Sequence, residues 1–378
     1  MKKLYAFVLT VCCALCVFAG CGKDKAAFTS KQRNFYAMDT SAALVVSDNF
    51  NDEKKAADYN RLCISVADTL SAFEDSLSAT NENSSVARFN AASAGEKLEI
   101  DKTAYDVIKL ALQVYRDTDG YYNPAVWYSV QDYGFFGLFW LMTPENLPAA
   151  ADVEKYVRLS EHFGETALEE ADGKYYVTKP QATVEVGGQT LSMKIDLGGI
   201  GKGYAVDKID LLLSEYGFNY GYFDFGSSSI ACKKFYNGDA YKLGFKNPRA
   251  ENISDTYLQT TLLDEKLSTS GDFERFYELD GTRYCHVIDP TTGAPVQKGI
   301  MSATVIGGSA AENDAYTTAI MAMGKERAVE FINAKISKRR VAFTVNEGGA
   351  YKIITNIPEG GYTVTNPAFS VADGIFSR

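Results

Sequence analysis

The segment from residue 196 to residue 217 constrains the fold more than any other part of the chain. It predicts the end of a strand at 193–196, a glycine-rich turn at 198–203 and a helix at 204–216. Glycines at the start of a helix allow close approach of a ligand, and the free N–H groups there attract phosphate. Lys202 adds positive charge, but the spacing is not that of a Walker A loop. Taken alone, the segment is equally consistent with a structural turn.

The remaining pattern mixes strands and helices without strict alternation. We expect strands at 35–46, 175–178, 183–186, 220–225 and 302–306, a strand hairpin at 342–354, and helices at 51–73, 103–118, 152–163 and from about 311. A polar loop is expected at 77–85 and an irregular aromatic stretch at 121–140. This order favours the α+β class, with one domain over residues 35–378.

The first twenty residues predict export. Lys2 and Lys3 precede an apolar run over residues 4–19, which is too short for a stable membrane-spanning helix and is typical of a signal peptide. Small residues precede Cys21, as in a bacterial lipobox. We therefore expect a signal peptide at 1–20, lipid on Cys21, a tether at 21–34 and a location on the extracytoplasmic face of a cell membrane. The alternative is cleavage nearby, with Cys21 a spare thiol.

Charge and cysteine usage exclude several other classes. The formal net charge is −10, which makes nucleic acid an unsuitable partner. Beyond Cys21 only Cys63, Cys232 and Cys285 remain, an odd number at wide spacing that is neither a disulfide framework nor a zinc site. The chain has two histidines, which are too few for a metal site built mainly from histidine ligands.

Two further segments carry candidate chemistry. Asp314, Thr317 and Thr318 share one helix face, and a carboxylate with neutral oxygens is a ligand set suited to Mg²⁺. Asp314 could instead cap the helix, with the threonines bonded back to the backbone. His286 precedes a tight turn at 289–293, where it could hold a substrate or move a proton, although a lone histidine is more often structural.

Together these segments resemble the ApbE family of FAD:protein FMN transferases. The matching motifs follow the family's order at residues 38–40, 77–90, 120–125, 196–204, 269–272, 286–293 and 313–319. Asp39 stands where the family has glycine, and Gly201 where it has alanine. Several long motifs in order are far more specific than any one of them.

The resemblance implies Mg²⁺-dependent transfer of FMN from the substrate FAD to a Thr or Ser hydroxyl of an exported or membrane-bound redox protein, with release of AMP. It implies that Asp314 and Thr318 hold the metal, with Thr317 adjacent and the Gly199 carbonyl completing the site. Asp314 or His286 would assist deprotonation of the acceptor hydroxyl. Positions expected to contact flavin or nucleotide are Met38, Thr80, Tyr121, Tyr122, Asn123, Asp196, Lys202 and Ile288.

Departures from the family pattern keep two alternatives open. Thr80 stands where a tyrosine often stacks on the flavin, Asn123 replaces a carboxylate, and Ala125 replaces a threonine. These changes bear on FAD affinity and leave the metal residues untouched. The alternatives are hydrolysis of FAD to FMN and AMP, and a lipoprotein that binds FAD without chemistry.

Overall fold

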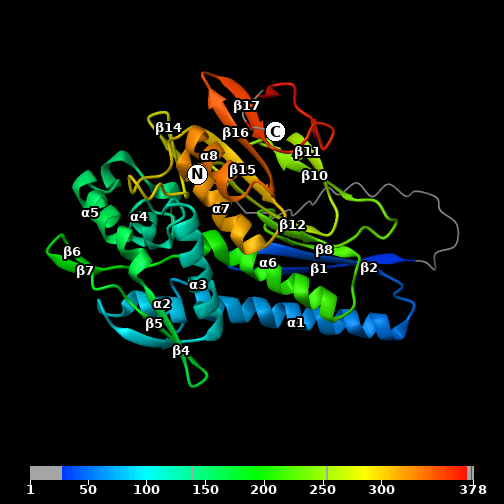
Figure 1. Cartoon of the computed structure of the whole chain (residues 1–378), viewed down its shortest axis with the longest axis horizontal. Helices are drawn as coiled ribbons and strands as arrows, with labels where there is room; N and C mark the ends of the chain where they lie inside the picture. Colours follow the sequence, from blue (N-terminus) through cyan, green and yellow to red (C-terminus); the bar gives the residue numbers. More distant parts are fainter. Residues whose placement is uncertain (1–27, 138, 253, 373–375, 377–378) are drawn as a thin grey trace, which may run out of the picture.

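The computed structural model describes residues 28–372, apart from 138 and 253, together with residue 376. The predicted signal peptide and Cys21 lie outside this part of the chain. Figure 1 shows one mixed α+β body built on a large sheet. Its nine strands lie in the order β1-β2-β8-β9-β12-β15-β16-β17-β19. They span Thr29–Ala37, Thr40–Asp48, Gly221–Phe225, Ser229–Cys232, Glu265–Gly271, Ile300–Ile306, Arg340–Glu347, Ala350–Thr355 and Phe369–Val371.

The sheet is covered on both faces, and its sequence shows why. Along β15 every residue is buried, because alternate side chains enter two different apolar clusters. Ala303 and Val305 pack in the cluster that includes the helices, whereas Met301 packs against a smaller sheet. That smaller sheet has the order β10-β11-β18. Its strands span Tyr241–Lys246, Thr256–Leu262 and Tyr362–Val364.

Helices and short strands complete the body. The helices are α1 (Glu53–Leu77), α2 (Ser85–Ala91), α3 (Lys102–Asp117), α4 (Trp127–Asp132), α5 (Ala150–Ser160), α6 (Gly198–Glu215), α7 (Ala310–Met323) and α8 (Lys325–Lys335). In Figure 1, α2 to α5 and the strands β3 to β7 form the lobe on the left, beside α6 and α7. The short strands are β3 (Lys97–Ile100), β4 (Ala167–Ala171), β5 (Lys174–Thr178), β6 (Thr183–Val186), β7 (Gln189–Ser192), β13 (Phe276–Leu279) and β14 (Thr282–Cys285).

Most predicted elements are confirmed, three predictions are wrong in detail, and one helix was not predicted. The strand expected at 35–46 is a hairpin, β1 and β2, turning at Met38 and Asp39. The loop expected at 77–85 is confirmed to within a residue at each end, and α2, which follows it, was not predicted. Residues 193–196 form no strand, and the glycines expected in a turn at 198–203 lie inside α6.

Buried side chains of the left lobe hold the segment that leads into α6. Asn90 accepts from the Ile195 N–H at 2.8 Å and donates to the Ile195 carbonyl at 2.9 Å, so a side chain replaces the missing strand partner. Lys179 is fully buried, and its ammonium donates to carbonyls at the end of α2, the closest being that of Ala92 at 2.8 Å. Burial lowers the pKa of Lys179 to about 8, and the nearby Lys194 acts in the same direction.

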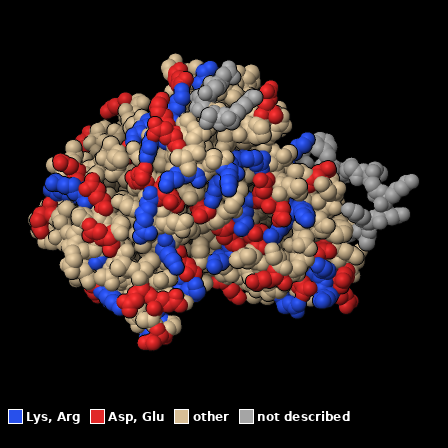
Figure 2. Space-filling view, in the orientation of Figure 1, with Lys and Arg blue, Asp and Glu red and all other residues tan. Residues whose placement is uncertain are grey.

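The surface and the thiols agree with the sequence. Figure 2 shows acidic and basic side chains interspersed over one face of the molecule. Cys63, Cys232 and Cys285 are free thiols. Among the described residues, none of the helices has the length and apolar character that crossing a membrane requires.

Candidate active site

A deep cavity lies where α6, α7 and the left lobe meet the large sheet. Its volume is about 2450 Å³, well above the roughly 300–1000 Å³ of ordinary small-molecule sites. Its walls come from the start of α6, from Asp314 and Thr318 inside α7, and from four further segments: the β1–β2 turn with residues 78–81, and residues 121–124, 273–275 and 286–288. The cavity therefore has room for a large ligand together with part of a second molecule.

Close packing of α6 on α7 creates the acidic end of this cavity. A Cβ atom added at Gly203 would lie 2.2 Å from the Ala310 carbonyl oxygen, so only glycine permits this approach. The Gly203 N–H donates to the Asp314 carboxylate at 3.0 Å. The six-residue glycine segment thus serves helix contact and not a turn, which is why the turn prediction failed.

One turn earlier on α6, Gly199 faces two predicted ligand positions. A Cβ added there would lie 3.3 Å from the Thr318 hydroxyl oxygen and 3.5 Å from the Tyr122 ring. Gly199, Thr318 and Tyr122 therefore meet at one point, beside Asp314. Residues from three separate segments converge, as the resemblance implied.

Twelve of the thirteen predicted active-site residues line the cavity. They are Met38, Thr80, Tyr121, Tyr122, Asn123, Asp196, Gly199, Lys202, His286, Ile288, Asp314 and Thr318. Thr317 does not line the cavity, because it is fully buried. Its hydroxyl forms hydrogen bonds with the Ser270 hydroxyl at 2.8 Å and with the Asp314 carbonyl at 2.8 Å. Thr317 lies behind Asp314 and not on the cavity wall.

The structural alternative for this segment had two parts. Asp314 does not cap α7, whereas the two threonines do bond back to the backbone. The N-cap is Ser309, whose side chain accepts from the Glu312 N–H, and Asp314 lies more than one turn inside the helix. The hydroxyls of Thr317 and Thr318 do bond back to the Asp314 carbonyl, at 2.8 Å and 3.2 Å. The Asp314 carboxylate itself remains directed at α6 and the cavity.

Lys202 is the positive centre of the site. Its charge counteracts the rise that burial imposes on the pKa values of Asp196, Glu274 and Asp314, all of which remain above their usual range. Burial lowers the pKa of His286 to about 3, and Lys202 reinforces that effect. His286 is therefore neutral near pH 7 in the ligand-free protein and a weak proton acceptor.

Two buried polar atoms at the site have no hydrogen-bond partner in the described chain, the Tyr122 hydroxyl and His286 Nδ1. A buried polar group without a partner is costly, and on a cavity wall it is available to bond a ligand. Burial, followed by the charges of Asp314 and Asp196, raises the pKa of Tyr122 far above its usual range, so its hydroxyl stays protonated. It is available to donate to an anionic oxygen.

The donor set fits a hard divalent cation. Among the described residues no three His, Cys, Asp or Glu side chains gather into a metal cluster. Mg²⁺ needs no such cluster, because it is commonly held by one or two carboxylates together with waters and substrate phosphates. Asp314, Thr318 and the Gly199 carbonyl supply that kind of partial site.

Other predicted positions have additional structural duties. Both polar atoms of Asn123 are engaged, Nδ2 with the Ser160 carbonyl at 3.0 Å and Oδ1 with the Ala125 N–H at 2.9 Å. Asn123 therefore shapes the wall of the cavity through these internal bonds. Met38 lies over Gly201 of α6, since a Cβ there would be 2.9 Å from its methyl group.

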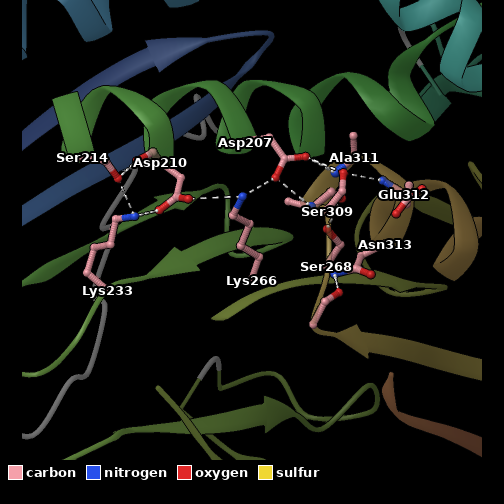
Figure 3. Close-up of polar contacts among 12 residues, drawn as sticks. Asp207, Asp210, Ser214, Lys233, Lys266, Ser268, Ser309, Ala311, Glu312 and Asn313 are labelled. Carbon is pink, nitrogen blue, oxygen red and sulfur yellow. Dashed lines mark hydrogen bonds and ion pairs between the residues drawn. The ribbon is translucent and has the colours of Figure 1, made fainter. Parts of the chain in front are cut away.

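A polar network anchors the start of α7 to α6 (Figure 3). The Asp207 carboxylate accepts from the Ser309 hydroxyl at 2.6 Å and from the N–H groups of Ala310 and Ala311 at 3.0 Å each. Lys266 lies between Asp207 and Asp210, at 2.8 Å and 3.2 Å. Asp207 therefore satisfies the free N–H groups of the helix that carries Asp314.

Three residues that the structure places at or near the site had no predicted role. Glu274 and Arg275 line the cavity beside His286, whose backbone N–H donates to the Arg275 carbonyl at 3.0 Å. The available signal was a charged pair one residue beyond the motif at 269–272. No sequence signal pointed to Asp207, because α7, the helix that it binds, lies about a hundred residues further along the chain.

The fold and site together define a mixed α+β protein with a large cavity, one wall of which is formed by two helices packed closely through the glycines of α6. Residues 38–343 match the ApbE family, and the chain belongs to that family. Its curated relatives include the FAD:protein FMN transferases of Escherichia coli K12, 25% identical over 304 residues covering 80% of each chain, and of Treponema pallidum, 25% identical over 325 residues covering 83% of this chain and 84% of the relative. The Buchnera aphidicola FAD:protein FMN transferase is 27% identical over 255 residues, covering 68% of this chain and 71% of its own.

Solved structures agree on the fold. The flavin transferase ApbE from Vibrio cholerae superposes with a TM-score of 0.70 at 23% identity, covering 87% of this chain and 97% of its own. The ApbE protein of Thermotoga maritima gives a TM-score of 0.69 at 26% identity, covering 85% and 96%. The predicted α+β class and the predicted family are both confirmed.

Proposed function

We propose that this protein transfers FMN from FAD to a Thr or Ser hydroxyl of an acceptor protein and releases AMP. The observation that carries the proposal is the meeting of Gly199, Thr318, Tyr122 and Asp314 beside Lys202, inside a cavity larger than one small ligand needs. Family membership supports the same reaction.

The reaction is a phosphoryl-type displacement. The acceptor hydroxyl oxygen bonds to the phosphorus of the FMN half, and the bond from that phosphorus to the bridging oxygen breaks. AMP leaves with the bridging oxygen, and the hydroxyl proton passes to a base. Lys202 and the Tyr122 hydroxyl face the charge that develops on the diphosphate.

We propose Mg²⁺ as the metal, held by Asp314, Thr318 and the Gly199 carbonyl, with Thr317 supporting Asp314 from behind. When bound, the ion would neutralise charge on the diphosphate and so favour departure of AMP. A buried carboxylate with a raised pKa gives up its proton on binding a cation, so metal and proton compete at Asp314.

The acceptor proton has three candidate destinations. His286 is a weak base while its pKa stays near 3, and an anionic ligand beside it would raise that value. Asp314 is engaged with the metal in this scheme. Glu274 lines the same cavity, and burial raises its pKa, which makes it a stronger base than an ordinary glutamate.

The flavin end of the cavity is proposed to be the wall formed by Met38, Thr80, Tyr121 and Ile288, with Asn123 and Asp196 at its floor. We also propose that lipid on Cys21 holds the domain on the extracytoplasmic face of a cell membrane. Acceptors would then be exported or membrane-bound redox proteins on the same side.

The test is incubation of the protein with FAD, Mg²⁺ and an acceptor domain that the Vibrio cholerae enzyme flavinylates. The proposal expects FMN bound covalently to the acceptor and one AMP released per FMN transferred. AMP release unaffected by the acceptor would favour FAD hydrolysis. FAD bound without turnover would favour a binding protein.

A further inference from the structure

The lining of the cavity extends from the residues around Asp314 to the edge of the small sheet. All six residues of β10 line it, including the buried Tyr241 and Phe245 and the exposed Lys242 and Gly244. Side chains alternate between the two faces of a strand, and at an edge the unpaired backbone groups are exposed as well. β10 is an edge strand of its sheet.

The register shows which backbone groups of the small sheet face which neighbour. Thr365, just after β18, donates its N–H to the Tyr257 carbonyl at 3.0 Å, so Tyr257 directs its backbone groups to β18. Backbone groups alternate along an antiparallel strand. Leu258 and Thr260 therefore direct theirs to β10.

The partners of these two residues on β10 are Phe245 and Leu243. Both use their N–H and carbonyl groups in the ladder with β11. The intervening Lys242 and Gly244 then direct theirs away from β11, toward the cavity. Gly244 is exposed and has no side chain, which allows another backbone to approach closely.

The edge of β10 leads to the reactive end of the site. The Lys246 ammonium lies 4.7 Å from the centroid of the Phe273 ring, and the next residue, Glu274, lines the same cavity. A chain paired along β10 would therefore run into the region of Glu274 and Asp314.

We propose that β10 is the docking edge for the acceptor polypeptide, which adds to it as an extended strand and so delivers its hydroxyl to the FMN phosphorus. The inference rests on the proposed transferase function, which requires a polypeptide in the cavity. Main-chain hydrogen bonds supply the affinity in this mode of recognition. Such pairing tolerates acceptors of differing side chains.

The test is Lys242→Pro in the full-length protein. The probe is an acceptor domain that the Vibrio cholerae enzyme flavinylates. Proline removes one outward N–H and is tolerated on an edge strand whose N–H faces solvent. Loss of one such bond is expected to raise KM for the acceptor about five- to tenfold. FAD affinity and acceptor-independent AMP release should stay unchanged.

Two controls isolate the backbone effect. Lys242→Ala removes the same side chain but keeps the N–H, and should leave KM near the wild-type value. Val364→Pro removes an outward N–H from the opposite edge of the sheet, which does not line the cavity. Equal KM values for Lys242→Pro and Lys242→Ala, or equal rises for Lys242→Pro and Val364→Pro, would overturn the inference.

Failure of the docking inference is distinguishable from failure of the function. If the wild-type protein does not flavinylate the probe, the proposed function fails for that acceptor, and backbone hydrogen exchange then tests docking alone. Slower exchange at Lys242 and Gly244 on adding the probe supports docking, and unchanged exchange contradicts it.

Discussion

Asp207 is expected to support activity without touching FAD, because it holds the first turn of the helix that carries Asp314. In Asp207→Asn one side-chain oxygen still accepts hydrogen bonds. The other oxygen is replaced by an NH₂ group, which cannot accept from the donors that face it. Loss of two charge-assisted hydrogen bonds, at about 1.5 kcal/mol each, predicts destabilisation of about 3 kcal/mol. A shift of α7 by about 1 Å would lower kcat/KM roughly 100-fold.

Asp210→Asn is the matched control. Asp210 lies one turn along α6 and binds Lys266 and Lys233, at 3.2 Å and 2.5 Å, but no hydrogen bond or ion pair from it to α7 is found in the described chain. Its loss should cost a similar free energy of unfolding while leaving Mg²⁺-dependent AMP release near the wild-type rate. The assay compares denaturant midpoints and Mg²⁺ titrations of AMP release for both variants. If both lose activity equally, Asp207 acts only through stability and the reasoning is refuted.

Three further predictions concern single side chains. Tyr122→Phe removes a buried hydroxyl that has no partner in the described chain, so the ligand-free protein should be as stable as the wild type, or up to about 1 kcal/mol more stable. Its affinity for FAD, measured by fluorescence titration, should fall. Lowered stability with unchanged FAD affinity would contradict this prediction. Lys179 has a pKa of about 8 when folded and 10.5 when unfolded, so the unfolded state binds more protons between these values and stability should rise by about 3 kcal/mol from pH 8 to 10.5. Lys179→Met should lack that rise in denaturant titrations, and an identical pH profile would refute the assignment. Gly203→Ala places a Cβ against the Ala310 carbonyl and should cost about 1–3 kcal/mol, whereas Gly137→Ala, which meets no atom within 4 Å, should cost little by the same measurement.

The sequence predicted the class and most elements because the apolar periodicity of the long helices and of the buried strands is strong. It missed the β1–β2 turn because Met38 and Asp39 adopt positive φ values of 49° and 56° without the Asn-Gly signal that such turns usually carry. It assigned 193–196 to a strand because extended apolar residues look alike whether a strand or the Asn90 side chain pairs with them.

The candidate site divides in the same way. Motif resemblance located the residues that line the cavity, since each motif supplies a short local segment. It put Thr317 next to the metal residues Asp314 and Thr318, but it did not show that the Thr317 hydroxyl turns away from the cavity toward Ser270, a residue from a distant strand. Asp207 and the edge of β10 depend on which elements are neighbours in space, and no local pattern encodes that.

The most direct test of the central claim is mass spectrometry of an acceptor protein after incubation with FAD, Mg²⁺ and either the wild-type protein or Asp314→Asn. With the wild-type protein the acceptor mass should increase by one FMN on a Thr or Ser, and with the variant, which should stay folded, the acceptor should stay unmodified. An unmodified acceptor with the wild-type protein, or equal modification with both, would contradict it.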